Sequence, residues 1–213
     1  MNKKHTKHAK IARPAYGQFG RRELTILGTP CSEIKLLSHV ITRGLPDVNT
    51  CHVDADHKGA EKEVLSPSLQ AGHAQEYVDK IGYHRFDQEA KPSAFELKSK
   101  LNDVDLVLVN GNHFDGDNQI LVIDSRKSLE KKLHKLTNVV LVLFKELDEQ
   151  IPAYLATHIA ELDGIPKLHM NDTKSIVAFV QHWMRKRIAP LHGMSVSIPF
   201  PTTLKAVYAV TSY

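Results

Sequence analysis

The segment Arg22–Lys35 constrains the fold more than any other, because it runs from an apolar stretch through a glycine into residues with helical spacing. The apolar residues before the turn are Leu24, Ile26 and Leu27. Gly28 can adopt a positive φ at low cost. Pro30 suits the first turn of a helix, and Thr29 is expected to cap that helix. The segment therefore predicts a strand, a tight turn and a helix, which form half of a βαβ unit.

The helix expected after this turn has apolar residues at three- and four-residue spacing, which places them on one face. These residues are Ile34, Leu37, Val40 and Ile41, with Leu36 beside them. A helix of this kind covers a sheet with that face. The first crossover is therefore expected to pack on a central sheet.

Strand and helix patterns alternate along the rest of the chain. Strands are expected at residues 48–54, 81–86, 106–109, 119–124, 139–144 and 165–169. Helices are expected at residues 94–101, 129–136, 151–162 and 176–187, the last of them capped by Asn171 or Asp172. Residues 58–80 form a long excursion with one short helix. The alternation predicts an α/β fold of three layers, with a doubly wound, mainly parallel sheet and right-handed crossovers.

The turn at Gly28 departs from a functional phosphate loop. Such a loop reads G-x-x-x-x-G-K-[ST]: its backbone N–H groups surround the phosphates, its lysine neutralises them and its hydroxyl holds Mg²⁺. Counted from Gly28, these last three positions fall on Glu33, Ile34 and Lys35. Glu33 also places a negative charge at a helix end that attracts anions. We interpret the fold as P-loop NTPase-like with a degenerate Walker A loop that has lost tight triphosphate binding.

Polar residues follow two other predicted strands at their carboxyl ends, where α/β sheets bind their ligands. Together with the first loop they form the candidate binding set: Gly28, Thr29, Ser32, Lys35, Asp54, Asp56, His57, Lys58, Asn110, Gly111, Asn112 and His113. Lys35 belongs to this set because a turn one residue longer would bring it to a phosphate. Structural roles remain open: Asp54 and Asp56 could cap a turn, and His113 could support a loop. The sequence assigns no catalytic residue and no metal ligand.

The bulk properties narrow the class of protein. With 213 residues the chain fits one domain with a core of its own. The two cysteines, Cys31 in the glycine turn and Cys51 in a predicted strand, form no disulfide or zinc pattern, so a reduced cytoplasmic interior is expected. No stretch reaches the ~20 apolar residues that span a bilayer, and no signal peptide is recognisable.

Three segments are expected. Residues 1–21 form a basic leader, residues 22–189 the α/β domain, and residues 190–213 a proline-rich linker with one further strand at Leu204–Val210. Residues 1–22 contain seven Lys and Arg and no acidic residue, although the whole chain carries only +4. Because no aromatic series or groove-reading helix accompanies these charges, a solvated leader is favoured over a nucleic-acid contact.

Four segments carry a resemblance to a known family. They are the strand-Gly-Thr-Pro-Cys at 24–31, Val-Asp-Ala-Asp-His-Lys at 53–58, Asp-Leu-Val-Leu-Val-Asn-Gly-Asn-His-Phe at 105–114, and Ile-Pro-Lys-Leu with Asp-Thr-Lys-Ser-Ile-Val near 165–177. They resemble the P-loop adaptor of molybdopterin-guanine dinucleotide biosynthesis, the MobB-like family, over residues 22–187. The family's triphosphate-binding lysine and hydroxyl have no counterpart at Ile34 and Lys35. Asn110 stands where the family usually has a carboxylate.

The chain is also similar to the amino-terminal half of bacterial fusions in which a degenerate adaptor precedes a nucleotidyltransferase domain. Members of that kind share the leader His-Ala-Lys-Ile-Ala-Arg-Pro at 8–14 and the Phe-Gly-Arg at 19–21. Leu204–Val210 resembles the first strand of the second domain, so a truncated fusion is one expectation. The resemblance implies GTP and Mg²⁺ as cofactors and molybdopterin as the ligand of the pathway. A nucleotidyltransferase is the implied partner, and a homodimer is a further expectation.

Two other classes of function remain open. Asp54-Ala-Asp-His57 and Gly111-Asn-His113 resemble fragments of a two-metal phosphoesterase site, although the other motifs of such a site are missing. Alternatively, the domain binds a partner and no nucleotide. The degenerate adaptor is preferred, with GTP hydrolysis by this chain alone not expected. Three lost charge-assisted contacts, each worth about 1.5–3 kcal/mol, would weaken triphosphate binding by several powers of ten.

Overall fold

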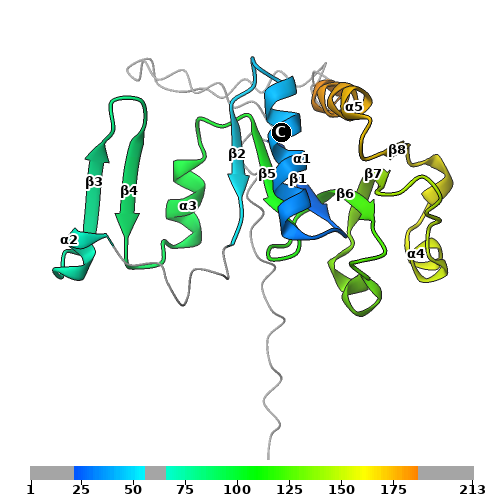
Figure 1. Ribbon diagram of the computed structural model, residues 1–213, viewed down its shortest axis with the longest axis horizontal. Coiled ribbons are helices and arrows are strands. Elements are labelled where there is room, and N and C mark those ends of the chain that lie inside the picture. The colour runs from blue at the N-terminus through cyan, green and yellow to red at the C-terminus, as the bar shows by residue number, and fades with distance from the viewer. Residues whose placement is uncertain (1–21, 56–65, 187–213) are drawn as a thin grey trace, which may run out of the picture.

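A single parallel sheet of six strands organises the molecule (Figure 1). The computed structural model describes residues 22–55 and 66–186. The strand order is β2-β5-β1-β6-β7-β8, and every neighbouring pair is parallel. The strands are β1 (Arg22–Leu27), β2 (Thr50–Val53), β5 (Leu106–Asn110), β6 (Asn118–Ile123), β7 (Asn138–Phe144) and β8 (Lys167–His169). The predicted fold class, a three-layer α/β fold with a doubly wound, mainly parallel sheet, is confirmed.

Helices cover both faces of this sheet. On one face, α1 (Cys31–Gly44) and α5 (Thr173–Lys186) pack on alternate residues of the central strands, among them Leu24, Leu108 and Ile120. On the other face, α4 (Ala153–His158) and the 3-10 helix η2 (Glu130–Lys135) pack around Leu27 and Leu121. The central strands β5 and β6 are buried along their whole length. Apolar burial on both faces is the main force that holds β1 in the middle of the sheet.

The first crossover depends on Gly28, which has a φ of +94°. A Cβ at this position would lie 2.1 Å from the carbonyl oxygen of Val122 in β6. No residue with a side chain fits here without moving β1 away from β6. The turn is short, because α1 begins at Cys31 with Pro30 as its N-cap residue. The expectation that Thr29 caps α1 is wrong: its hydroxyl is used in a contact with β6, described below.

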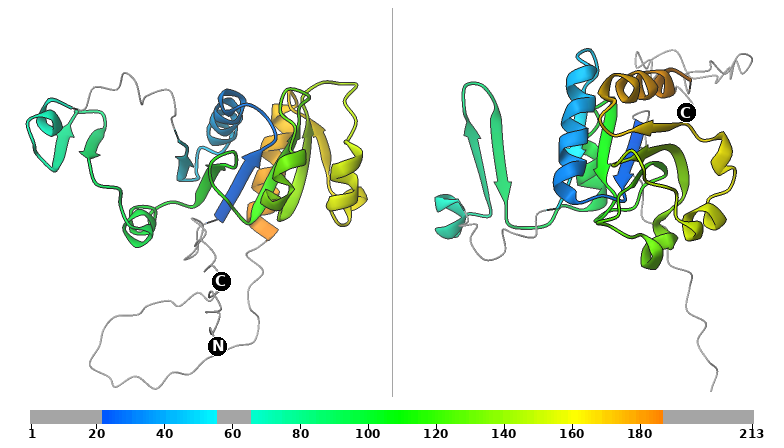
Figure 2. Two further views of the ribbon diagram at one scale, coloured as in Figure 1. Left: turned by 90° about the horizontal axis from the view of Figure 1, so that it is seen from below. Right: turned by 45° about the vertical axis from the view of Figure 1, so that its right-hand side comes forward.

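A hairpin stands beside the main sheet as a separate two-stranded antiparallel sheet (Figure 2). It consists of β3 (Gln75–Asp79) and β4 (His84–Gln88), and the short helix α2 (Pro67–Gln70) precedes it. The prediction of one strand at 81–86 is therefore wrong. Ile81 has a positive φ of 64° and belongs to the turn, so the apolar run was split between a turn and a strand.

Three helix predictions also need correction. Leu36 is 60% exposed and does not belong to the buried face of α1, which consists of Ile34, Leu37, Ser38 and Ile41. Residues 129–136 form η2 rather than a regular helix, since Lys132 interrupts it with non-helical angles. The predicted helix at 151–162 divides into α4 and the 3-10 helix η3 (Leu162–Gly164), because Ile159 is extended and Glu161 left-handed. The prediction of α3 (Ala94–Lys100) is confirmed, with Ser93 and Glu96 forming its capping box.

Two expectations concern residues outside the described ranges, namely the basic leader at 1–21 and the strand at Leu204–Val210. Among the described helices, none combines the length and the apolar character that crossing a membrane requires.

We expect Gly28→Ala to lower the free energy of unfolding by about 3 kcal/mol or more, because the left-handed conformation and the clash with Val122 add. Gly72→Ala is the matched control: Gly72 has a similar φ of +96° but no atom within 4 Å of its Cβ position. That variant should lose only about 1–2 kcal/mol. Urea titration followed by far-ultraviolet circular dichroism measures both, and equal losses would contradict the packing argument.

Candidate functional site

The loops that follow the parallel strands meet at the carboxyl edge of the main sheet, where the candidate binding set was expected. Asn110, the last residue of β5, donates a hydrogen bond from Nδ2 to Oδ1 of Asp54 at 2.7 Å. Asp54 directly follows β2, which pairs with β5 in parallel. The prediction that these two strand ends lie together is confirmed.

The loop after β5 is tied to the first crossover. Asn112 donates from Nδ2 to the carbonyl oxygen of Thr29 at 2.9 Å, and its own backbone N–H donates to Asn110 Oδ1 at 3.0 Å. Gly111 passes so close to β1 that a Cβ would lie 2.6 Å from Thr25 Cγ2. Lys135 of η2 donates to the carbonyl oxygen of Gly111 at 3.0 Å. These contacts hold the loop after β5 against the turn at Gly28.

One contact between the two loops joins a thiol to an imidazole, those of Cys31 and His113. The sulfur of Cys31 lies 3.3 Å from Nε2 of His113, and Nδ2 of Asn112 lies 3.5 Å from the same sulfur. Cys31 is half-buried and is the first residue of α1. The expectation that Cys31 lies in the glycine turn is therefore wrong, because the helix already begins at this residue.

The rest of the candidate set divides into three groups. Gly28 and Thr29 are buried in the crossover. Ser32 and Lys35 are exposed on α1. The longer turn that would bring Lys35 to a phosphate is not formed, because α1 begins at Cys31 and Lys35 is its fifth residue. Asp56, His57 and Lys58 lie outside the described residues.

A carboxylate that was not in the candidate set joins the crossover to β6. The hydroxyl of Thr29 donates to Asp124 Oδ2 at 2.6 Å, and the guanidinium of Arg126 donates to both carboxylate oxygens, at 2.9 and 2.7 Å. The side chain of Asp124 is only 1% exposed. The hydrogen bonds from Arg126, with the one from Thr29, outweigh the effect of burial and lower the pKa of Asp124 to about 2. Asp124 is therefore ionised at any pH at which the protein works.

Glu33 occupies the amino-terminal end of α1 together with two cations. Its carboxylate accepts from Lys145 Nζ at 3.2 Å and from Arg126 Nη2 at 3.4 Å. Lys145 directly follows β7, and Arg126 follows β6. In a phosphate loop this position receives the anion of the ligand. Here the anion is supplied by the protein, and the two cations are already paired.

Asp124, Arg126 and Lys145 were missed by the sequence reasoning. The sequence pattern could have indicated Asp124, because it ends the predicted strand at 119–124 just as Asp54 ends the one at 48–54. No pattern singles out Arg126 or Lys145, because single cations are common at strand ends.

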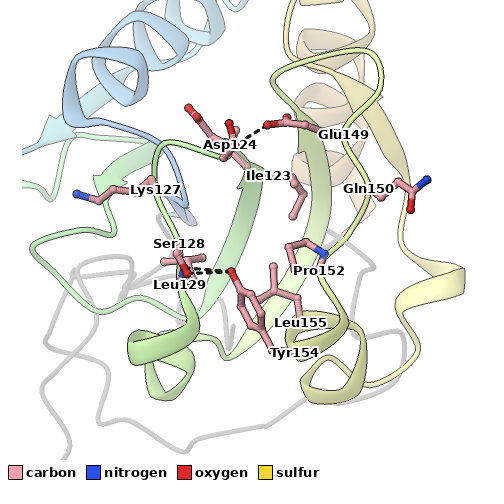
Figure 3. A pocket seen from close by; sticks show the side chains of 12 residues that line it. Ile123, Asp124, Lys127, Ser128, Leu129, Glu149, Gln150, Pro152, Tyr154 and Leu155 are labelled. Carbon is pink, nitrogen blue, oxygen red and sulfur yellow. Dashed lines mark hydrogen bonds between the residues drawn. The ribbon is translucent and has the colours of Figure 1, made fainter.

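A pocket of about 240 Å³ opens beside this network, between the loops after β6 and β7 (Figure 3). Asp124 and Glu149 lie at one end, and Tyr154 and Leu155 at the other. Glu149 accepts from the backbone N–H groups of Ser125 and Lys145, at 2.9 and 3.0 Å, and so joins the two loops. The pocket is lined mainly by apolar groups with a few polar ones, as sites for small organic ligands usually are.

The Asp54 end of the edge carries a second titratable pair. His52 Nε2 lies 3.6 Å from Asp54 Oδ2. Burial lowers the pKa of His52 despite this carboxylate. Burial would raise the pKa of Asp54, but hydrogen bonds from the Ala55 N–H and from Asn110 lower it overall. Near neutral pH, Asp54 is thus a carboxylate, and its Oδ1 accepts both of these hydrogen bonds.

The donor set does not fit a resident Mg²⁺ ion. In residues 22–55 and 66–186, no group of three or more His, Cys, Asp or Glu side chains is placed to hold a metal. The two carboxylates at the loop, Asp54 and Asp124, both accept hydrogen bonds from the protein. We therefore derive no chemistry through a metal here.

Comparison with solved structures finds MobB proteins. No protein-family model and no curated protein matches the sequence. One structure of Bacillus subtilis MobB is 13% identical over 75% of this chain and 95% of its own length, with a TM-score of 0.52. A second is 16% identical over 76% and 96%, with a TM-score of 0.54. A MobB protein homolog from Bacillus stearothermophilus is 16% identical over 78% and 99%, with a TM-score of 0.50.

The likeness shows the fold. The identities are too low for more than that, although nearly the whole length of each MobB chain is covered. The predicted resemblance therefore holds at the level of architecture. The fusion to a nucleotidyltransferase stays a prediction.

We expect Asp124→Asn to remove a pH-dependent part of the stability. A carboxyl with a pKa of about 2 in the folded chain and 3.8 in the unfolded chain stabilises the fold above pH 4, and the contribution disappears as the pH falls towards 2. Because Arg126 is half exposed and screened by water, we expect a loss of about 1–2 kcal/mol at pH 7.

Urea titrations at pH 7 and pH 3, followed by the fluorescence of the only tryptophan, Trp183, measure this loss. The difference between wild type and Asp124→Asn should shrink at pH 3. Asp103→Asn, at an exposed turn, is the control and should show no such pattern. A difference that grows at low pH would contradict the role given to Asp124.

Proposed function

We propose that this chain is a degenerate GTP-binding-type adaptor domain of molybdenum-cofactor biosynthesis, acting in the formation of molybdopterin guanine dinucleotide. In this proposal the domain supports a nucleotidyltransferase and performs no transfer itself. The chain's own motifs and its structural likeness to MobB proteins support the pathway. The proposed site is the carboxyl edge of the sheet.

One observation carries the proposal: the first crossover has the strand, glycine turn and helix of a P-loop-like unit, while internal ion pairs occupy the charged groups at the start of its helix. Gly28 turns tightly against β6, and α1 begins three residues later with its amino-terminal end at the site. Glu33 binds Lys145, which would otherwise be free for a phosphate. Arg126 also reaches Glu33, but Asp124 holds its guanidinium with two shorter hydrogen bonds. A chain built in this way positions ligands and partners better than it grips a triphosphate.

The ligand proposed for the site is a nucleotide or the pterin of the pathway. The pocket beside Asp124 has apolar walls for a planar ring, with Ser128 and Tyr154 as polar partners. A phosphate group would then face Lys145 and Arg126, in competition with Glu33. Mg²⁺ would have to come with the nucleotide, because the described carboxylates offer it no prepared site.

The partner and the alternatives stay predictions. The nucleotidyltransferase, fused or separate, and a homodimer follow from the resemblance and not from contacts in the structure. The phosphoesterase alternative depends on Asp56 and His57, which lie outside the described residues. A Mn²⁺ titration combined with a phosphodiester assay tests that alternative.

We expect GTP with Mg²⁺ to bind this chain with a dissociation constant above about 1 μM, because Glu33 competes with the phosphates for Lys145 and Arg126. Glu33→Ala should tighten binding about tenfold, since it frees Lys145 and removes a negative charge from the helix end. Isothermal titration calorimetry measures both values. Glu89→Gln, an exposed substitution beyond the hairpin, is the control and should leave binding unchanged.

Two results would contradict this account in different ways. Binding by the wild type tighter than about 1 μM would show that the loop still grips a triphosphate. No change on Glu33→Ala would show that the carboxylate does not compete with the ligand. A separate titration with molybdopterin tests the pathway ligand, and absence of binding to either ligand would favour a module that binds only a partner.

A further inference from the structure

Cys31 and His113 form a nucleophile and base pair that the proposed adaptor function does not use. They come from different segments: Cys31 is the first residue of α1, and His113 lies in the loop after β5. The 3.3 Å between sulfur and Nε2 is within hydrogen-bonding reach for a thiol and an imidazole. This is the geometry by which a base activates a thiol.

Two further features surround the sulfur. Asn112 places its amide nitrogen 3.5 Å from Sγ, and its orientation is fixed by the hydrogen bond to the carbonyl oxygen of Thr29. The sulfur also stands at the amino-terminal end of a helix of 14 residues, a position where reactive cysteines are often found. Both features act on the sulfur of Cys31 and not on any other thiol of the chain.

The charged groups around the pair are largely neutralised by one another. On α1, Glu33 is paired with Lys145 and Arg126. From η2, Lys135 binds the carbonyl oxygens of Gly111 and Asn112 at 3.0 and 3.4 Å. From the residue after β2, the carboxylate of Asp54 interacts electrostatically with His113. A negative charge is therefore near the imidazole that receives the thiol proton.

Cys51 is a built-in control. It lies in β2 and packs with Val107 and Val109 in a separate apolar cluster. Burial raises the pKa of the Cys51 thiol. These two are the only cysteines of the chain, so any reaction of the thiols is divided between them.

We infer that Cys31 is a reactive thiol that forms mixed disulfides with low-molecular-weight disulfides, with His113 as its base. The Cys31 S–H proton moves to His113 Nε2 as the sulfur attacks one sulfur of the disulfide. The disulfide's S–S bond breaks, a new S–S bond forms to Cys31, and the leaving thiolate takes up a proton. Cys31 is oxidised, and the released half of the reagent is reduced to a thiol. The added group would lie beside Thr29 and Asn112, at the loop of the proposed site.

The test measures the rate at which each cysteine of the full chain reacts with 5,5′-dithiobis(2-nitrobenzoate). Cys51→Ala leaves Cys31 alone, and Cys31→Ser leaves Cys51 alone. We expect the Cys31 protein to react at least about tenfold faster at pH 7. In urea the two proteins should react at similar rates, because the folded surroundings are then lost.

His113→Gln in the Cys51→Ala protein tests the base. It should slow the reaction several-fold at pH 7 and remove the part of the pH dependence of the rate that comes from a histidine base. Phe114→Leu is the matched control, since it changes the ring that contacts His113 edge-on without removing the base. Circular dichroism checks that each variant is folded.

A second measurement decides the question if a variant fails to fold. The wild-type chain is incubated with oxidised glutathione, and mass spectrometry locates the adduct. We expect it on Cys31 and not on Cys51. An adduct mainly on Cys51, equal rates for the two thiols in the folded chain, or a His113→Gln protein with unchanged rate and pH profile would each overturn the inference.

Discussion

The buried carboxylate of Asp124 is the interaction on which the carboxyl edge of the sheet depends. It joins the first crossover to β6 through Thr29 and fixes Arg126 through two further hydrogen bonds. A buried charge is tolerated only when it is paired and hydrogen-bonded, and here the bonds come from two different parts of the edge. Removing this carboxylate would release Thr29 and Arg126 together. The network extends to Glu33, because Arg126 contacts both carboxylates, and from Glu33 to Lys145.

The shape of the first crossover and the charges beside it are fixed by different interactions. The shape is enforced by packing, because Gly28 must pass close to the carbonyl oxygen of Val122. Glu33 and Lys145 are only partly buried and pair with each other. A carboxylate at Glu33 then plays the part that a phosphate plays in a working loop. The scaffold and the chemistry of the loop are thus separable properties of the same sequence.

The fold was largely predictable because burial on both faces leaves a continuous apolar run in each central strand, as Leu106–Val109 illustrates. The hairpin was mispredicted because its strands are mostly exposed, and Ile81 belongs to its turn. In the site, Asp54 and Asn110 were predictable as strand-end residues and do meet. Thr29 was assigned a local role as a cap, since no local pattern reveals a partner 95 residues away in Asp124. Contacts of this kind are set by the order of the strands, which the sequence does not state.

The same strand order brings Cys31 and His113 together. Because β5 is the direct neighbour of β1, the loop after β5 must lie against the start of α1, and Gly111 allows that loop to come close. The position that gives a phosphate loop its ligand contacts therefore gives this chain a thiol next to an imidazole. Where a phosphate loop has a lysine and a hydroxyl, this chain has Ile34 and Lys35, so the start of its helix carries different chemistry. The same type of helix end that binds phosphate in other proteins is also a common place for reactive cysteines.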